Sequence, residues 1–307
     1  MTAPKGNIRR AASGGSNERT YSMTNTTGAA RKNNKKSGLQ GVDGNETQQD
    51  DAANPERNWF GYTRVDPREK TARVLGVFDN VAGRYDIMND AMSMGIHRLW
   101  KNRLIRDIRP QPHERFLDVA GGTGDIAFRL FEATNRNAAI TVCDINANML
   151  EVGRDRALDR GYGNALEWVT GNAEALPFPS ATTTTDGFGG FDVYTIAFGL
   201  RNVTHIDKAL TDAARVLKSG GRFYCLEFSH VDNPILRRAY DAYSNAIIPR
   251  MGQAITNDSD SYQYLVESIR QFPRREALKA RLIEAGFSRA SYTTLTHGVV
   301  CIHCAIK

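Results

Sequence analysis

Residues 117–125 form the most constraining feature of the chain, an apolar run that passes into Gly121 and Gly122 and then into a predicted helix. A second apolar run, residues 140–143, ends on Asp144. Glycine lets the backbone approach a bound group where a Cβ would collide, and the start of a helix offers unpaired N–H groups. A carboxylate at the tip of the neighbouring strand is placed to accept hydrogen bonds from ribose hydroxyls. The two segments together predict a crevice that binds a nucleoside.

From Trp59 onward, strand-like and helix-like patterns alternate, which is typical of an α/β fold built on a mostly parallel sheet. The last two strand-like runs meet at His297 and Gly298, so we expect them to form an antiparallel hairpin at the C-terminus. These patterns predict a Rossmann-like, seven-stranded sheet with helices on both faces. The predicted strands are residues 115–120, 139–144, 166–170, 191–198, 222–228, 290–296 and 299–306.

Glycine follows the predicted helices that lie between these strands. Helices 147–160 and 275–285 are each followed by a glycine, which accepts the left-handed conformation of a helix C-terminus. Helix 205–217 is expected to stop at residues 219–221, which are Ser-Gly-Gly. Residues 204–207 fit a capping box, so this helix is expected to begin there.

Two stretches do not belong to a minimal alternating sheet. Residues 70–108 form a helical segment before the first strand, and residues 230–273 form an insertion before the last helix. Ligands in open α/β sheets bind outside the carboxyl ends of the strands. We therefore expect a helical cap and a substrate-covering insertion at that edge, within one domain that spans residues 59–307.

The N-terminal segment has a different composition. Residues 1–58 offer almost nothing that would seed a core, and asparagine, serine, threonine and glycine dominate, so we expect disorder. Residues 1–36 are rich in basic residues and serine and hold one acid, Glu18, as organelle-targeting segments do. The segment is either a mitochondrial targeting sequence or a plain disordered tail.

Composition and cysteine positions bear on membrane, metal and nucleic-acid contacts. The chain has 307 residues and a formal net charge of +6, and no apolar run reaches the ~18 residues that a membrane-spanning helix needs, so any membrane contact is expected to be peripheral. Cys143, Cys225, Cys301 and Cys304 lie in strand-like runs, which predicts reduced, buried thiols. Cys301 and Cys304 point to opposite faces of a strand, so no metal is predicted. The basic residues are scattered without aromatic interleaving, so no nucleic-acid partner is predicted.

Two kinds of nucleoside fit the glycine turn. Residues 122–127 also satisfy the dinucleotide fingerprint, with Asp144 where a dehydrogenase would hold its ribose. Asp118 and Asp125 flank the turn, however, which suits a cationic ligand and would repel a pyrophosphate. Residues 172–177 offer a polar-then-apolar lip for an adenine. These features favour S-adenosylmethionine over a nicotinamide cofactor, and a methyltransferase over a dehydrogenase.

Four segments carry a resemblance to a known family. Residues 85–100 (YDIMNDAMSMGIHRLW), 197–203, 215–229 and 257–265 resemble, in the same order, the ubiquinone/menaquinone-biosynthesis C-methyltransferases. The resemblance implies the class I methyltransferase fold, whose last strand is antiparallel, and S-adenosylmethionine as methyl donor. It also implies methylation of a ring carbon of a polyprenylated methoxy-benzoquinol. In eukaryotes it implies a peripheral position on the matrix side of the mitochondrial inner membrane, within a ubiquinone-biosynthesis complex.

The same resemblance implies a set of cofactor contacts. It assigns them to Thr123, Asp144, Asn172 and Ala173, and the glycine turn adds Gly121 and Gly122.

Catalysis requires alignment of the ring carbon with the methyl group and help with a proton, because a phenol ionises only near pH ~10. Arg201 follows the fourth predicted strand, where its guanidinium would favour a phenolate or orient a water; the alternative is an ion pair that holds the edge loop. Asp258 and Tyr262 in the insertion are candidates for contact with the quinol head. His97 is interpreted as a solvated or packing residue, and the basic helix 94–108 as a candidate membrane contact.

Two rivals to a ubiquinone enzyme stay open. One is a demethylmenaquinol methyltransferase acting on a naphthoquinol, and the other is a catalytically idle scaffold that binds S-adenosylmethionine within a quinone-biosynthesis complex. The oligomeric state is open as well, a homodimer included.

Overall fold

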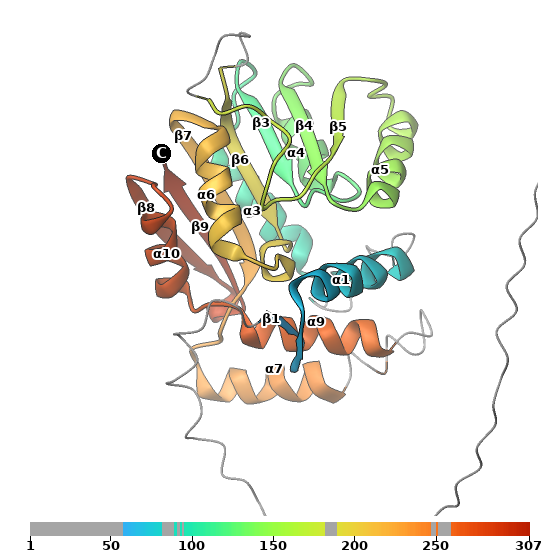
Figure 1. The fold of residues 1–307 in the computed structure, drawn as a ribbon, viewed down its shortest axis with the longest axis vertical. Helices are drawn as coiled ribbons and strands as arrows, with labels where there is room; N and C mark the ends of the chain where they lie inside the picture. Colours follow the sequence, from blue (N-terminus) through green and yellow to red (C-terminus); the bar gives the residue numbers. More distant parts are fainter. Residues whose placement is uncertain are drawn as a thin grey trace, which may run out of the picture. The chain divides into compact units, whose positions relative to one another are not determined.

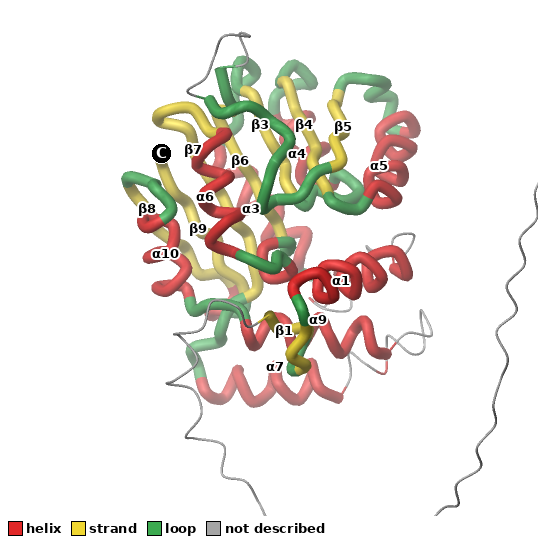
Figure 2. Tube along the Cα trace, in the orientation of Figure 1, coloured by secondary structure: helices red, strands yellow, loops and turns green. Residues whose placement is uncertain are grey.

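The structure is a computed structural model that describes residues 58–81, 89–90, 93, 95–181, 189–246, 250 and 259–307. It contains one large sheet with helices on both faces and a small hairpin of β1 (Asn58–Phe60) and β2 (Thr63–Val65) (Figures 1 and 2). The predicted N-terminal tail lies outside the described residues, apart from Asn58. None of the helices in these described ranges is long and apolar enough to cross a bilayer.

The large sheet has seven strands in the order β5-β4-β3-β6-β7-β9-β8. Strands β3 to β7 are parallel, whereas β9 pairs in antiparallel fashion with both β7 and β8. The predicted fold class is confirmed, including the antiparallel last strand. The strands are β3 (Arg115–Val119), β4 (Ala139–Asp144), β5 (Leu166–Thr170), β6 (Phe191–Ala197), β7 (Leu217–Phe228), β8 (Arg289–Leu295) and β9 (Val300–Ile306).

Two apolar cores cover the two faces of the sheet. Residues of α3, α4 and α5 pack with one face, and residues of α6 and α10 pack with the other. Cys143, Cys225 and Cys301 are buried free thiols as predicted, while Cys304 is half-buried. The α-helices are α1 (Pro67–Val81), α3 (His97–Ile108), α4 (Asp125–Ala133), α5 (Ala147–Asp159), α6 (Ile206–Val216), α7 (Pro234–Ala246), α9 (Ser259–Gln271) and α10 (Arg275–Glu284).

The turn after α6 differs from the sequence prediction. The helix ends at Val216, and β7 begins immediately at Leu217, which pairs with Phe191 of β6. The predicted stop at residues 219–221 is therefore wrong. Gly220 and Gly221 exchange backbone hydrogen bonds with Lys307 at 3.0 Å, so they join the sheet to the chain end instead of capping the helix.

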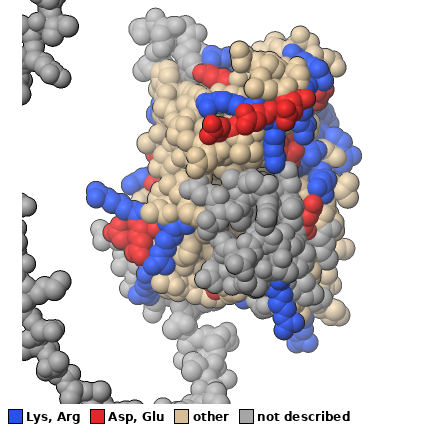
Figure 3. Space-filling model, turned by 90° about the vertical axis from the view of Figure 1, so that its right-hand side faces the viewer, with Lys and Arg blue, Asp and Glu red and all other residues tan. Residues whose placement is uncertain are grey.

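The extra helices lie mostly at one edge of the sheet. Figure 1 shows α1, α9 and α7 beyond the carboxyl ends of the parallel strands. Within the predicted 70–108 cap, α1 lies at this edge, whereas α3 packs against α4 and β7 through Trp100 and Leu104. On the face in Figure 3, Lys and Arg lie beside Asp and Glu over the upper part, where α5 is placed, as in an ordinary solvated helix surface.

Candidate active site

The turn between β3 and α4 bends through backbone conformations that favour glycine. Ala120, Gly122 and Gly124 all have positive φ, at 50°, 52° and 84°. A Cβ on Gly124 would lie 2.7 Å from the Trp168 ring and 3.0 Å from Phe128, so the α4 start has no room for a side chain. The turn therefore presents bare backbone toward the carboxyl edge of the sheet, as the sequence predicts.

Asp144 ends β4 beside this turn and is held in place by backbone donors. Its Oδ2 accepts from the Gly122 N–H at 2.8 Å, and its Oδ1 accepts from the Asn146 N–H at 2.8 Å. Burial raises the pKa of Asp144 to about 6, although these two backbone bonds counteract the rise. Each carboxylate oxygen keeps a further lone pair, so the group can still accept hydroxyl hydrogen bonds.

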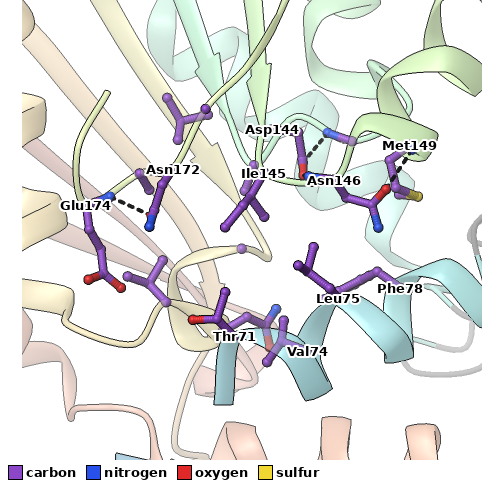
Figure 4. A pocket seen from close by; sticks show the side chains of 18 of the residues that line it. Thr71, Val74, Leu75, Phe78, Asp144, Ile145, Asn146, Met149, Asn172 and Glu174 are labelled. Atoms are coloured by element: carbon purple, nitrogen blue, oxygen red, sulfur yellow. Dashed lines mark hydrogen bonds between the residues drawn. The ribbon is translucent and has the colours of Figure 1, made fainter. Parts of the chain in front are cut away.

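A cavity of about 790 Å³, part of it open to solvent, adjoins Asp144 and Gly122. Its lining combines apolar side chains with a few polar groups, which is typical of sites for small molecules and cofactors. Figure 4 shows Leu75 and Phe78 of α1 opposite Ile145, with Asn172 and Glu174 at the other end. The described residues that line the cavity are Thr71, Val74, Leu75, Phe78, Val119, Ala120, Gly122, Asp144, Ile145, Asn146, Met149, Gly171, Asn172, Ala173, Glu174, Phe198, Gly199, Asn202, Val203 and Thr204.

Helix α1 closes one wall of the cavity and is bonded to the segment that follows β6. The Lys70 ammonium donates to the Val203 carbonyl at 3.0 Å, and the hydroxyls of Thr71 and Thr204 are 3.1 Å apart. Burial lowers the pKa of Lys70 to about 8, and the charge of Glu174 partly offsets this. The apolar wall is thus fixed to the sheet edge through polar bonds near the N-terminal end of α1.

Glu174 takes the capping role that the sequence assigned to residues 204–207. His205 is the N-cap of α6 and forms no side-chain capping bond. Instead, the Glu174 carboxylate accepts from the backbone N–H groups of Thr204 and His205, each at 3.0 Å, and lies 2.7 Å from His205 Nδ1. The predicted capping box is wrong because a carboxylate from the loop after β5 satisfies these donors.

Arg201 lies in a short 3₁₀ turn, Leu200–Asn202, just after β6. Its Nη1 donates to Glu227 Oε1 at 2.7 Å and to the Phe198 carbonyl at 2.6 Å. Both charged side chains are buried, at 4% and 1% exposure. Burial raises the pKa of Glu227, against the opposing effect of the Arg201 charge. Because Phe198 lines the cavity with a φ of 57°, Arg201 secures a strained part of the cavity wall.

Comparison with known proteins identifies the family of this chain. Residues 67–307 match the ubiE/COQ5 methyltransferase family. The chain is 51% identical over 265 residues to the mitochondrial 2-methoxy-6-polyprenyl-1,4-benzoquinol methylase of Oryza sativa subsp. japonica, which covers 81% of this chain and 87% of that protein. The chain belongs to the ubiE/COQ5 methyltransferase family. The resemblance stated from the sequence is confirmed.

Other relatives of this ubiE/COQ5 family chain agree. It is 53% identical over 250 residues to the ubiquinone/menaquinone biosynthesis C-methyltransferase UbiE of Brucella abortus (strain S19), which covers 81% of this chain and 90% of that protein. The fold is similar to a SAM-dependent methyltransferase structure from Thermotoga maritima, with a TM-score of 0.52 and 17% identity over 76% of this chain and 99% of that one. The protein is a methyltransferase, as predicted.

Within this family member, the predicted cofactor residues separate into two groups. Gly122, Asp144, Asn172 and Ala173 all line the cavity. The other two, Gly121 and Thr123, are not among its described lining residues. A Cβ on Gly121 would lie 2.6 Å from Val142, and the Thr123 hydroxyl accepts from Arg156 at 3.1 Å, so both serve the packing behind the turn. Their assignment as cofactor contacts stays a prediction.

The two acids that flank the glycine turn do not face the cavity. Asp118 is buried behind the turn, where it accepts from the Thr195 hydroxyl at 2.7 Å, and burial raises its pKa to about 7. Asp125 pairs with Lys101 at 2.7 Å and Arg129 at 3.0 Å. The argument that these acids receive a cationic ligand is therefore wrong, although the methyltransferase prediction it supported is right.

The predicted substrate residues are described only in part. Asp258 lies outside the described residues, and the side chain of Tyr262 on α9 does too. A neighbour does reach the site, because the buried Tyr264 hydroxyl donates to Asn202 Oδ1 at 3.0 Å and its ring stacks on Phe60. His97 is buried and lies 2.9 Å from Asp90 Oδ1, which supports the packing interpretation over the solvated one.

Sequence reasoning placed a helical cap at this edge, but it did not name the α1 residues that line the cavity or the start of α5. Ile145 is 38% exposed although it directly follows a buried strand, and Asn146 caps α5 by accepting from the Met149 N–H at 3.1 Å. An apolar residue placed immediately after Asp144, the acid predicted to bind ribose, is a signal that was present in the sequence. The α1 residues gave no such signal, because an apolar face on a helix does not indicate which part of the protein it packs against.

Proposed function

We propose that this chain transfers a methyl group from S-adenosylmethionine to a ring carbon of 2-methoxy-6-polyprenyl-1,4-benzoquinol, a step of ubiquinone biosynthesis. The observation that carries the proposal is the cavity in which Asp144 and the bare turn at Gly122 face an apolar wall of α1. The names of the Oryza and Brucella relatives support this substrate and reaction class.

The residues present fit the proposed cofactor. The turn at Gly122 and Gly124 leaves backbone exposed where a Cβ would be strained or would collide. Asp144 would hold ribose hydroxyls, and Ile145 with Ala173 would contact the adenine. Bound S-adenosylmethionine supplies an electrophilic methyl group on a sulfonium. The chain's own contribution is to bind, orient and exclude water, since alignment alone contributes several kcal/mol to such a transfer, on the order of 7 or more in well-oriented systems.

Arg201 is proposed to act on the proton that the reaction releases. Arg201 does not itself line the cavity, but its neighbour Asn202 does, and the buried Nε of Arg201 has no hydrogen-bond partner among the described residues. As a guanidinium it would favour a phenolate or orient a water, not remove a proton directly. Asp258 and Tyr262 are kept as proposed contacts to the quinol head, with α7 and α9 as its cover.

The setting of the reaction is part of the proposal. A polyprenyl tail does not partition freely into water, so we propose peripheral membrane contact at the matrix side of the mitochondrial inner membrane. The mitochondrial names of the Oryza and Xenopus laevis relatives support this compartment. Residues 1–58 would then form a targeting tail ahead of the 59–307 domain, and other proteins of a ubiquinone-biosynthesis complex would be partners.

A methyl-transfer assay tests the proposal directly. The purified chain is incubated with methyl-labelled S-adenosylmethionine and either a short-chain methoxy-benzoquinol or a short-chain naphthoquinol. Labelled benzoquinol is the expected product. Preference for the naphthoquinol would favour the menaquinone activity that the name of the Brucella relative includes. Cofactor binding with neither product labelled would favour a scaffold that lacks turnover.

A further inference from the structure

A second recess lies away from the methyl-transfer site, between the end of β7, helices α7 and α9, the start of α10 and strand β8. It has a volume of about 1380 Å³, part of it open to solvent, and shares no described lining residue with the cofactor cavity. Arginines from three helices converge on it: Arg237 from α7, Arg270 from α9, and Arg274 with Arg275 at the start of α10.

The basic groups of this recess exceed its acids. Asp232 is engaged by Arg275, and Glu276 accepts from the Tyr292 hydroxyl at 2.7 Å. The Arg274 carbonyl accepts from the Leu278 N–H, but the Arg274 side chain forms no hydrogen bond or ion pair with the residues that the structure describes. Arg237 makes a 3.5 Å contact with the Asp232 carbonyl. Two exposed guanidinium groups thus face solvent across the recess with most of their donors unused.

The start of α10 adds backbone donors to the same place. Arg274 is its N-cap residue and provides no side-chain capping bond. The N–H groups of the first turn and the positive end of the helix dipole favour an anion at such a terminus. His230, also in the lining, has its pKa lowered by burial and by the charges of Arg274, Arg275 and Arg237, which places all these groups in one electropositive region.

Below the basic rim the recess has an apolar floor. Val231, Val266 and Ile269 line it and are all buried. Guanidinium groups together with an apolar floor fit a ligand that carries both a phosphate and a hydrocarbon chain.

We propose that this recess binds the phosphate group of a phosphomonoester or phosphodiester through Arg237, Arg274 and the start of α10. The apolar floor of Val231, Val266 and Ile269 fits the headgroup region of an anionic phospholipid, and a soluble phosphate compound offers the same anionic chemistry. Helix α9 separates the two cavities, since Val266 and Ile269 line the recess while Tyr264 bonds to Asn202 of the cofactor cavity. A bound headgroup would therefore set the insertion helices beside the bilayer. This site is additional to the proposed methyl transfer.

The experiment uses the full chain and three probes. These are inorganic phosphate, dihexanoyl phosphatidylglycerol below its critical micelle concentration, and vesicles of phosphatidylcholine with or without phosphatidylglycerol. The test variant is Arg237→Gln with Arg274→Gln. The matched control is Lys208→Gln with Arg289→Gln, which removes the same charge from exposed positions outside the recess. Both variants keep the basic N-terminal segment, whose contribution to vesicle binding is then constant.

The wild type and the control are expected to bind phosphatidylglycerol alike, in monomer and vesicle form. The test variant is expected to bind the monomer at least about tenfold more weakly, because it loses two charge-assisted contacts to the phosphate. Lipid binding without uptake of inorganic phosphate identifies the headgroup as the source. Saturable inorganic phosphate binding that the test variant loses identifies a soluble source. Absence of binding to every probe, or an equal loss in test and control variants, overturns the proposal. Cofactor affinity and turnover on a short-chain quinol are expected to be unchanged in both variants, so a failure of methyl transfer is separately visible.

Discussion

Substitution of Arg201 by methionine is expected to destabilise the fold severely. The guanidinium and the Glu227 carboxylate are 96% and 99% buried and lie 2.7 Å apart. Removing one partner of such a pair leaves a buried charge without compensation, which typically costs about 3–5 kcal/mol. For a unit of roughly 250 residues this lowers the melting temperature by roughly 6–20 °C. Differential scanning calorimetry of Arg201→Met measures the fall.

A double-mutant cycle and a control make this test specific. Arg201→Met combined with Glu227→Gln removes both charges, so the pair of changes is expected to be less destabilising than the sum of the single changes. Arg103→Met is the control, because Arg103 pairs with Asp107 at an exposed position, where the expected loss is about 1 kcal/mol or less. If Arg201→Met lowers the melting temperature no more than Arg103→Met does, the buried pair is not holding the cavity edge. A double variant that is stable and binds cofactor but lacks turnover would instead establish the proposed catalytic role.

Three further changes probe the cavity. Asp144 is proposed to bind ribose as a carboxylate, and burial raises its pKa to about 6. The cofactor dissociation constant is therefore expected to rise about tenfold per pH unit below pH ~6 and to be level above it, whereas Asp144→Asn should bind weakly with no such slope. A wild-type affinity unchanged between pH 5 and 7 would contradict this. Lys70→Met removes the hydrogen bond to the Val203 carbonyl together with a buried charge. Cofactor release, measured by stopped-flow, should therefore accelerate roughly tenfold with little change in the stability of the fold. An unchanged release rate would exclude α1 as a barrier to cofactor exit. Gly124→Ala forces a positive φ on a residue whose Cβ would collide with the Trp168 ring. This should lower the free energy of unfolding, measured by denaturant titration, by at least about 2 kcal/mol. A decrease of less than about 1 kcal/mol would show that the turn can relax.

The sequence predicted the fold and the centre of the site because both depend on local patterns. Strand periodicity located β3 and β4, and glycine at positions 122 and 124 marked a turn that few other residues permit. Asp144 follows at the end of the next parallel strand, so topology alone brings it beside the turn. These inferences need no knowledge of side-chain partners.

The sequence predictions were wrong where a side chain's role depends on a partner far away in the sequence. Asp118 looked like a ligand group, but alternate residues of a parallel strand face opposite covered sides, so a mid-strand acid is buried and bonds to Thr195. The capping of α6 comes from Glu174, about thirty residues earlier, which no local motif announces. For Arg201 the sequence left an ion pair open as the alternative role, but it could not name the partner, Glu227 of β7. Each case depends on a contact between separate elements.

The segment after β6 connects these distant contacts into one unit. Lys70 of α1 holds Val203, Glu174 of the β5 loop holds the N–H groups of Thr204 and His205, and Tyr264 of α9 holds Asn202. Each hydrogen bond alone contributes only about 0.5–1.5 kcal/mol, or somewhat more where a charge takes part. Together they fix helix α1, the loop after β5 and helix α9 to a single short stretch of chain. A ligand can shift the positions of these elements only by as much as it binds one arrangement of this stretch more tightly than another. Cofactor binding and the position of α9 are therefore expected to be thermodynamically coupled in this protein.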